Sequence, residues 1–594
     1  MPCMNSVASE DFADFISPYF SSPEAFMRSQ GTDCIDFVSS TLAIVYVPLS
    51  TVTPFTFTSY TYSAVPKLYS LLDLTSMDAA GITRASELPV LNNQGEGVLI
   101  GFVDTGISYT DSLFRNPDGS TRILGIWDQT LTGTESVPGT GRSESPESSQ
   151  TDPGLSAARP EFSFFPALYG TQYTREQIDL ALTSDDPFAI VPSRDTNGHG
   201  TFLASIAAGN RDERAEFSGA APRASIAMVK LKPAKNYLRD FYLVRDGADA
   251  YQENDLMMGV AYLYALAGQL SMPLVVCLPL GTNMGSHMGT DRLSQYLNEV
   301  SLLNGSAVIT AAGNETGARH HFRAVTEPDT EEVTVELRVG EEEQDSGFSM
   351  ELWAQDAGIY TVGFLSPTGE VIRDIRFPLR GENTVSFLLE ETRITVYNQI
   401  ADVSAGSQFV FMRFEKPFAG IWRILIRNFL DIQETVHLWL PVRGFLSDNT
   451  FFLRPDPDII ITDPGNARYP LTIAACDHTN GSIYIHSSRG YSRSGQIKPD
   501  LAAPGVNILG ASASGRRLTR MTGTSVAAAH VAGAAAILLH WGILDGNYPY
   551  MNTPVLRSIF VRGAKRNPAL TYPNREFGYG TLDLYEAFLR LRNI

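Results

Sequence analysis

Three short motifs in this chain carry an aspartate, a histidine and a serine, in that order. They are Val103-Asp104-Thr105-Gly106, Asp195-Thr196-Asn197-Gly198-His199-Gly200-Thr201 and Gly523-Thr524-Ser525-Val526-Ala527. A serine hydroxyl needs a base to remove its proton before it can act as a nucleophile. Histidine suits that role, and a buried carboxylate can hold the imidazole in one tautomer. The motifs therefore predict nucleophilic catalysis, with Asp104, His199 and Ser525 as a triad.

Each motif also has a purely structural interpretation when it is taken alone. Asp-Thr-Gly is often a turn after a strand, Gly-His-Gly can be a loop, and Gly-Thr-Ser can cap a helix. The three together, in this order and at the ends of predicted elements, favour chemistry. A fourth motif, Ala311-Ala312-Gly313-Asn314, ends another apolar run. The Asn314 amide is placed to donate to a developing oxyanion, and the alternative is an Asx turn.

The elements that must position these residues read as a parallel α/β sheet. The run from Gly97 to Ile107 is almost continuously apolar, which is typical of a strand buried on both faces. A helix is expected at Leu256–Gln269, and strands alternating with helices indicate a parallel sheet. Further buried strands are expected at Ala224–Leu231, Leu274–Leu278 and Ala307–Ala312, and later helices at Ser525–Leu539, Pro554–Gly563 and Leu582–Arg592.

The chain divides into three predicted units. Residues 1–75 form a small α+β unit and linker, residues 76–322 and 455–594 form the α/β domain, and residues 323–454 form an inserted β-sandwich. The period of two in Val333–Val339 and Trp422–Arg427 predicts the antiparallel strands of that insertion. In the first unit we expect helices at Asp11–Phe15 and Pro23–Ser29, a strand at Thr41–Pro48 and helix-like structure by Leu68. Thr134–Pro160 reads as a surface loop.

Composition limits the partners of this chain. Its 594 residues have a net charge of -20 and a pI of about 4.9, so neither nucleic acid nor an anionic membrane is an expected partner. The four cysteines suggest no metal site or disulfide framework. The acidic cluster Glu341–Glu343 with Asp345 reads as a solvated loop rather than a calcium site. Without a secretory signal or an apolar run of membrane-spanning length, a cytoplasmic location is expected.

The motifs resemble those of the subtilase family over residues 95–320 and 455–590. The matching pieces are VDTGI, DTNGHGT, TAAGN, KPDLAAPG and GTSVAAAHVAGAAA, and the order Asp…His…Ser is that of subtilisin. The resemblance implies a serine endopeptidase acting on a protein or peptide, with Asn314 in the oxyanion hole. It also implies that Pro279-Leu280-Gly281 and Ala311-Ala312-Gly313 flank the substrate and its S1 pocket. No cofactor is expected, although subtilases often bind structural calcium.

Within that family the chain is most similar to the clostridial germination-specific proteases. The similarity rests on YSAVPKLYSLLD, GITRASELPVLNNQGEGVLIGFVDTGI, TRILGIWDQT and the large β insertion. In that group the N-terminal unit is a prodomain, the insertion is a jelly roll and the substrate is a spore cortex-lytic pro-enzyme. The resemblance thus implies a spore-associated location, the chain's own prodomain as a partner, and self-cleavage between about Thr58 and Ser76.

Two departures from the family pattern leave alternatives open. Val526-Ala527-Ala528-Ala529-His530 stands where Met-Ala-x-Pro-His is usual, and Pro279 replaces a small residue at the pocket edge. The first predicts a more regular helix start, and the second a changed P1 preference. A catalytically silent regulator on the same fold is the main alternative function. A third possibility is carbohydrate binding by the β-sandwich, where Trp353 and Trp422 are expected to be core residues instead.

Overall fold

The computed structural model describes most of the 594 residues. The described ranges are 6–7, 9–32, 34–52, 55–57, 59–71, 80–86, 93–131, 165–212, 217–328, 332–375, 380–430, 432–513 and 518–592. The predicted surface loop at Thr134–Pro160 lies outside these ranges.

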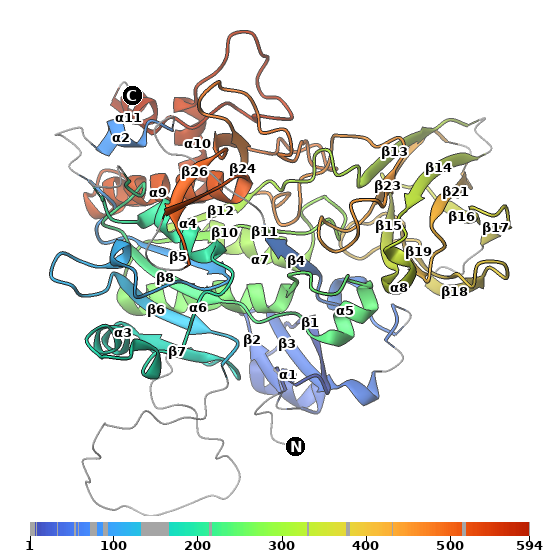
Figure 1. The fold of residues 1–594 in the computed structure, drawn as a ribbon, viewed down its shortest axis with the longest axis horizontal. Helices are drawn as coiled ribbons and strands as arrows, with labels where there is room; N and C mark the ends of the chain where they lie inside the picture. Colours follow the sequence, from blue (N-terminus) through green and yellow to red (C-terminus); the bar gives the residue numbers. More distant parts are fainter. Residues whose placement is uncertain are drawn as a thin grey trace, which may run out of the picture.

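An eight-stranded sheet lies at the centre of the molecule (Figure 1). Its strand order is β25-β24-β12-β10-β5-β8-β6-β7, and all neighbours pair in parallel except β6 and β7. The predicted buried strands are confirmed. The strands are β5 (Leu99–Asp104), β6 (Ile123–Asp128), β7 (Thr171–Thr174), β8 (Ser225–Lys230), β10 (Leu274–Leu278), β12 (Ser306–Ala311), β24 (Leu471–Cys476) and β25 (Leu501–Pro504).

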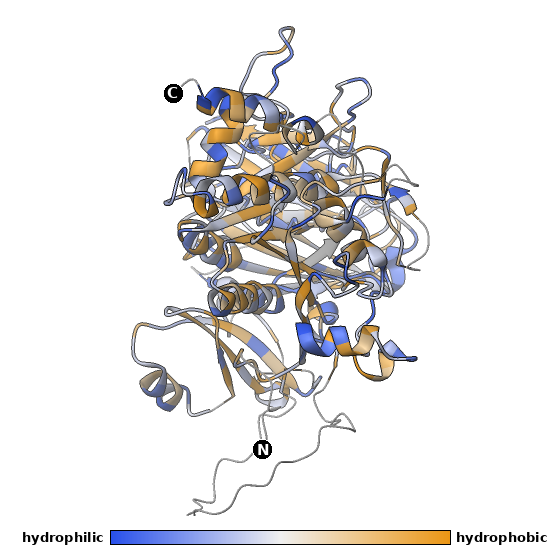
Figure 2. Ribbon diagram, turned by 90° about the vertical axis from the view of Figure 1, so that its left-hand side faces the viewer, coloured by the Kyte–Doolittle hydropathy of each residue, from blue (hydrophilic) through white to orange (hydrophobic). Residues whose placement is uncertain are grey.

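Helices cover both faces of this sheet, so its strands are apolar on both sides. Ile100 and Phe102 of β5 pack into a core shared with one set of helices, and Leu99 and Val103 pack into a core shared with the other. Figure 2 shows these hydrophobic strands running through the middle of the molecule between helices. The first set is α4 (His199–Ala208), α9 (Thr524–Leu539) and α10 (Thr553–Gly563); the second is α6 (Glu253–Leu270) and α7 (Arg292–Ser301).

Helix α9 is the most apolar helix of this core. The helical run Thr524–Leu544 has a mean hydropathy of 1.6 and passes a test of length and composition for crossing a membrane. That result contradicts the expectation that no such run exists. Because 83% of the tested window is buried inside the protein, the run is explained as a core helix. Helix α9 begins at Thr524, and the more regular start expected from the missing proline stays a prediction.

The N-terminal unit is a three-stranded antiparallel sheet of order β1-β3-β2, with one helix packed on it. The helix predicted at Asp11–Phe15 is wrong, because these residues lie in strand β1, which pairs along its whole length with β3. Helix-like structure at Leu68 is also wrong, since β4 begins there. Cys34 is disulfide-bonded, which the cysteine spacing did not predict. The elements are β1 (Phe12–Pro18), α1 (Pro23–Gln30), β2 (Ile35–Phe37), β3 (Leu42–Pro48) and β4 (Leu68–Leu71).

Two antiparallel sheets make up the inserted region, at the right of Figure 1. Their orders are β13-β22-β15-β20-β19-β18 and β17-β16-β21-β14-β23, and they share one apolar core. Trp353 and Trp422 are buried, as predicted. The strands are β13 (His321–Thr326), β14 (Val333–Val339), β15 (Phe348–Ala354), β16 (Tyr360–Leu365), β17 (Val371–Ile375), β18 (Arg380–Ser386), β19 (Arg393–Gln399), β20 (Phe409–Glu415), β21 (Gly420–Asn428), β22 (Glu434–Trp439) and β23 (Phe451–Phe452).

One acidic residue of this region departs from its predicted environment. Glu343 was expected in a solvated loop, yet it is buried at the start of the short helix α8 (Glu343–Ser346). Its carboxylate accepts hydrogen bonds from the Ser447 backbone N–H at 2.6 Å and the Thr450 hydroxyl at 3.0 Å. These bonds replace the water that the charged group gives up. The remaining helices are α2 (Ile82–Ser86), α3 (Arg175–Leu182), α5 (Asn236–Tyr242) and α11 (Leu584–Arg592).

A cluster of aromatic rings joins the three units. Phe411 of the insertion lies 5.0 Å from Phe57 of the N-terminal unit and 5.6 Å from Phe241 of the α/β domain, measured between ring centroids. Tyr62 contacts Phe409 in the same cluster, at 4.3 Å. Aromatic pairs of this kind stabilise beyond the area they bury.

We therefore expect Phe411→Ala to lower the free energy of unfolding by about 3–5 kcal/mol, the usual cost of emptying a buried aromatic site. Denaturant unfolding followed by fluorescence would measure the loss. Phe20→Ala is the control, because Phe20 is 92% exposed and its truncation should change little. Equal stability of the two variants would show that the cluster contributes nothing to the junction.

Candidate active site

Asp104 and His199 form a buried pair at the carboxyl end of β5. Asp104 is the last residue of β5 and is fully buried, and His199 is the first residue of α4. The His199 Nδ1 atom lies 2.9 Å from both carboxylate oxygens of Asp104. The Thr105 backbone N–H also donates to this carboxylate, at 2.7 Å. This arrangement fixes the imidazole with Nε2 directed away from the aspartate, as a general base requires.

Glycine at position 200 allows the close approach of α4 to β5. A Cβ atom added at Gly200 would lie 2.2 Å from the Gly106 carbonyl oxygen and 3.1 Å from Asp104 Oδ1. Before it, Gly198 caps the helix with φ of 96°, in the left-handed region that favours glycine. The Gly-His-Gly pattern is therefore required by the geometry of the pair.

Asp195 connects the two motifs, a role that reasoning from the sequence did not assign. Its Oδ1 accepts from the Thr105 hydroxyl at 2.9 Å and the Gly198 N–H at 2.7 Å. Its Oδ2 accepts from the N–H and the hydroxyl of Thr201 at 2.9 and 2.6 Å. A carboxylate that satisfies so many donors holds both loops in register. The signal was present in the sequence, as the aspartate that opens Asp195–Thr201.

Ser525 and Asn314 lie at the ends of the neighbouring elements. Ser525 is the second residue of α9, and its Oγ donates to the Pro279 carbonyl at 3.3 Å. Asn314 follows β12, and its Oδ1 accepts from the Thr524 N–H at 3.1 Å. With that oxygen engaged, the Asn314 NH₂ group is the part left to bind an oxyanion. Helices α4 and α9 pack against each other on one face of the sheet, so His199 and Ser525 both stand at helix starts.

A described peptide segment lies against the predicted substrate edge. Strand β4 lies between β11 (Leu280–Gly281) and β9 (Tyr251–Gln252) in a small antiparallel sheet. Leu71 pairs with Leu280, and Ser70 pairs with Gly281. The β9 edge was missed because two residues ahead of a helix carry no motif.

The second predicted edge has different neighbours. Ala311 ends β12, Ala312 donates its N–H to the Ile473 carbonyl, and Gly313 donates its N–H to the Thr524 hydroxyl at 3.1 Å. Ala311, Ala312 and Gly313 thus lead the chain to Asn314. Among the described residues, β4 pairs with the first predicted edge through β11 and does not pair with this second edge.

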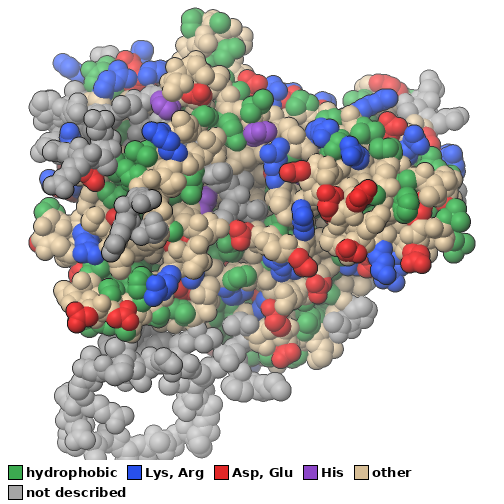
Figure 3. All heavy atoms as spheres, in the orientation of Figure 1, with side chains coloured by type: hydrophobic (Ala, Val, Ile, Leu, Met, Phe, Trp, Pro, Cys, Tyr) green, Lys and Arg blue, Asp and Glu red, His purple; other side chains and the backbone are tan. Residues whose placement is uncertain are grey.

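No group of three or more His, Cys, Asp or Glu residues suited to a metal ion occurs in the described ranges. Cys277 and Cys476 are free and buried, and burial raises the pKa of both thiols, which makes them poor nucleophiles. On the face drawn in Figure 3, acidic and basic side chains are interspersed over the inserted region.

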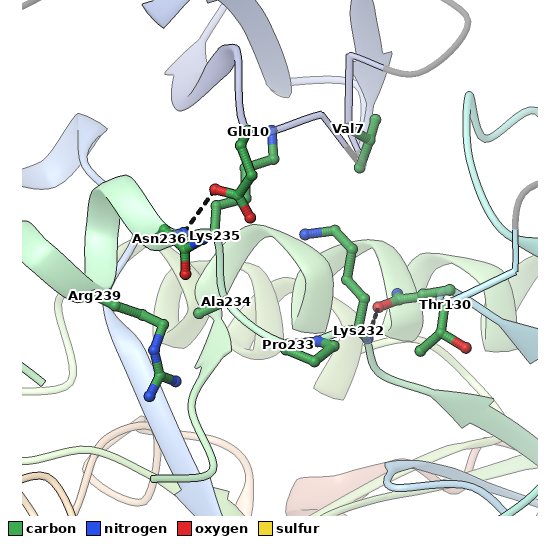
Figure 4. Close-up of a pocket in the computed structure, with 10 residues that line it drawn as sticks. Val7, Glu10, Thr130, Lys232, Pro233, Ala234, Lys235, Asn236 and Arg239 are labelled. Carbon is green, nitrogen blue, oxygen red and sulfur yellow. Dashed lines mark hydrogen bonds between the residues drawn. The ribbon is translucent and has the colours of Figure 1, made fainter. Parts of the chain in front are cut away.

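A cavity of about 380 Å³ lies where the N-terminal segment meets the start of α5 (Figure 4). Its lysines already have partners: Lys232 pairs with Asp255, and Lys235 pairs with Asp14, both at 2.6 Å. The Glu10 carboxylate accepts from the Asn236 N–H at 2.8 Å. None of the proposed site residues lines this cavity.

Comparison with known proteins agrees with this geometry. The subtilase family model matches residues 95–363 and 457–580. The chain belongs to the subtilase family. The solved structure of the CspB protease of Clostridium perfringens is 28% identical, covers 87% of this chain and 99% of that chain, and superposes with a TM-score of 0.73. The endopeptidase fold expected from the motifs, a subtilisin-like α/β fold, is therefore confirmed.

Two plant relatives are more distant. Subtilisin-like protease SBT1.9 of Arabidopsis thaliana is 24% identical over 492 residues, which are 77% of this chain and 59% of that protein. Subtilisin-like protease SBT3.8 of the same plant is 29% identical over 176 residues, 28% of this chain and 20% of that protein. The chain thus spans less than two thirds of the length of either plant protein.

The Asp104–His199 pair predicts an activated hydroxyl on Ser525. A fluorophosphonate probe should label Ser525, and His199→Ala should slow labelling by at least about 10²-fold, the lower range for loss of a general base. Mass spectrometry of labelled peptides measures the rate. His486→Ala is the matched control, because the His486 ring contacts the Thr316 carbonyl and the Tyr484 ring, neither of which belongs to the proposed site. Equal labelling of His199→Ala and the control would remove His199 from the site.

Proposed function

We propose that this subtilase is a serine endopeptidase that works through an acyl-enzyme. The observation that carries the proposal is the buried Asp104–His199 pair, with Ser525 at the start of the adjacent helix and strand β4 lying between β9 and β11, the two edges of the proposed substrate cleft. The chemistry draws only on side chains and backbone groups of the chain. The substrate class is protein, since β9 and β11 pair with an extended backbone.

In the proposed mechanism, Asp104 holds the His199 ring and stabilises its positive charge once the ring is protonated. His199 removes the Ser525 proton as Oγ attacks the carbonyl carbon of the substrate. The oxyanion that forms is bound by the Asn314 NH₂ group and by the Ser525 backbone N–H at the start of α9. His199 then protonates the leaving amine, and a water molecule hydrolyses the ester with the same base.

The N-terminal unit is proposed to be a prodomain that the enzyme cleaves from itself. Its docking supports this: Asp14 forms a buried ion pair with Lys235 at 2.6 Å and accepts from the Gln252 amide at 2.8 Å. Strand β4 then runs along β11, with Leu71 opposite Leu280. Pro279 precedes Leu280 and accepts from the Ser525 hydroxyl. We propose that the cleaved bond is the one after Leu72, the next residue of the chain after β4, which lies outside the described residues.

The physiological substrate is proposed to be a spore cortex-lytic pro-enzyme, with the protein acting in association with the spore. This part rests on the sequence resemblance to the germination-specific proteases and on the similarity to a clostridial protease. One observation favours the alternative of a silent regulator, namely that β4 fills the cleft in the described structure. Turnover of an added peptide by the purified protein separates the two functions.

The register of β4 predicts where self-cleavage occurs. Wild-type protein should run on a denaturing gel as fragments of about 72 and 522 residues, and the larger one should begin Asp73-Leu74-Thr75. Ser525→Ala should remain one chain with an unchanged fold. Intact 594-residue wild-type protein that still labels with fluorophosphonate would contradict self-processing and leave the peptidase proposal standing.

Asn314→Ala tests the oxyanion site. It should keep the labelled serine but lower kcat by about 10²–10³-fold, the loss measured for the corresponding asparagine of subtilisin itself. The comparison is steady-state hydrolysis of a peptide by the variant and by Asn480→Ala, in an exposed turn. A normal kcat for Asn314→Ala would assign oxyanion binding to backbone N–H groups alone.

A further inference from the structure

The side chain of Lys67 is buried just before the strand that fills the cleft. Lys67 is 1% exposed and directly precedes β4. Its Nζ lies 3.4 Å from Glu253 Oε2, donates to the Tyr62 carbonyl at 3.3 Å and lies 4.6 Å from the centre of the Tyr62 ring. A lysine is rarely buried without a specific partner, so the groups around this position compensate the charge of the Lys67 ammonium group.

Glu253 binds both the charge and the backbone of this residue. It follows β9 directly and is the first residue of α6. The Lys67 N–H donates to Glu253 Oε2 at 3.2 Å, and the Glu253 N–H donates to the Lys67 carbonyl at 3.0 Å. The other carboxylate oxygen accepts from the Leu293 N–H at 3.0 Å. Glu253 is therefore held rigidly in place whichever peptide lies in the cleft.

More acidic groups surround this position. Glu351, Asp291 and Asp463 are also buried. Burial raises the pKa of Glu253, which the charge of Lys67 opposes and that of Asp291 reinforces. Burial also raises the pKa of Glu351, and hydrogen bonds to its carboxylate and the charge of Lys67 oppose that rise. Within the described ranges, Lys67 is the only lysine or arginine that forms a salt bridge with any of these four carboxyl groups. An empty position would leave Glu253 without the cation that pairs with it.

We propose that Glu253 selects protein substrates carrying a lysine or arginine five residues before the residue whose carbonyl is attacked. This inference rests on the proposed function. A substrate that takes the place of β4 makes the same backbone pairs with β9 and β11, so its residue at that position reaches Glu253. Because a buried carboxylate without a partner is costly, substrates lacking the cation bind less well.

The test uses quenched fluorescent peptides with the sequence of residues 65–76, VPKLYSLLDLTS. One peptide keeps lysine at the position of Lys67, one carries arginine and one carries methionine, which has similar volume and no charge. The measured quantity is the ratio of kcat/KM between peptides. This ratio does not depend on the fraction of enzyme whose cleft is open, since that fraction cancels.

With wild-type protein, the lysine peptide should exceed the methionine peptide by at least about tenfold in kcat/KM, with the arginine peptide within about threefold of lysine. In Glu253→Gln the preference for lysine should fall below about threefold. Glu176→Gln is the matched control, because Glu176 is exposed at the start of α3, and it should keep the wild-type preference.

The outcomes separate this inference from the proposed function. Equal cleavage of the lysine and methionine peptides by wild-type protein would overturn the lysine preference and leave the peptidase standing. A preference that survives in Glu253→Gln would assign it to another residue. Failure to cleave any peptide, together with no fluorophosphonate labelling, would overturn the proposed function and this inference with it. The wild-type comparison is decisive even if Glu253→Gln does not fold.

Discussion

The whole site depends on the parallel pairing of β5, β10 and β12. The carboxyl ends of parallel strands lie at the same edge of a sheet, so strand pairing alone brings together residues that are far apart in the chain. Asp104 ends β5, Pro279 follows β10 and Asn314 lies just beyond β12, and these strands are neighbours. The chain order of the strands also reverses in this part of the sheet, and such switch points are where open α/β sheets bind ligands.

The same edge receives the two helix starts that carry His199 and Ser525. Both helices pack on one face of the sheet in a single apolar core, and α9 is buried there along its whole length. The seven alanines among the 16 residues of α9 bring the helix close to the strands, and Gly200 brings α4 close to Asp104. The position of the catalytic atoms is thus set by packing in the core, and a larger side chain there would displace them.

The sequence predicted those features whose signal is local and missed those created by distant partners. Buried strands such as β5 have long apolar runs, and the motifs at their ends marked Asp104, His199, Ser525 and Asn314. Segment Asp11–Phe15 was assigned to a helix, because only its pairing with β3 makes it a strand. Leu68–Leu71 gave no strand pattern for the same reason: its partners, β9 and β11, lie about 180 or more residues away along the chain.

Glu343 and Cys34 were misjudged on similar grounds. An acidic run looks solvated in sequence, and nothing local shows that the Ser447 N–H and Thr450 hydroxyl will meet the Glu343 carboxylate. Such partners are fixed only once the fold is complete. Asp195 differs, because its motif was visible and only its role was missing; that role follows from the number of donors that converge on one carboxylate.

The contact between Lys67 and Glu253 links folding of the chain to its proposed specificity. Before cleavage, β4 is part of the same chain and pairs with the cleft at a high effective concentration. After the proposed cleavage, the N-terminal unit would keep its own interface, through Asp14, Lys235 and the aromatic cluster. A substrate must therefore displace a segment that is still held nearby.

Backbone pairing is common to every peptide and gives a substrate no advantage over β4. A substrate can match the affinity of β4 only through its side chains, and the side chain that faces Glu253 is one of the few that can do so. A charge buried among carboxylates distinguishes one peptide sequence from another more strongly than an apolar contact would.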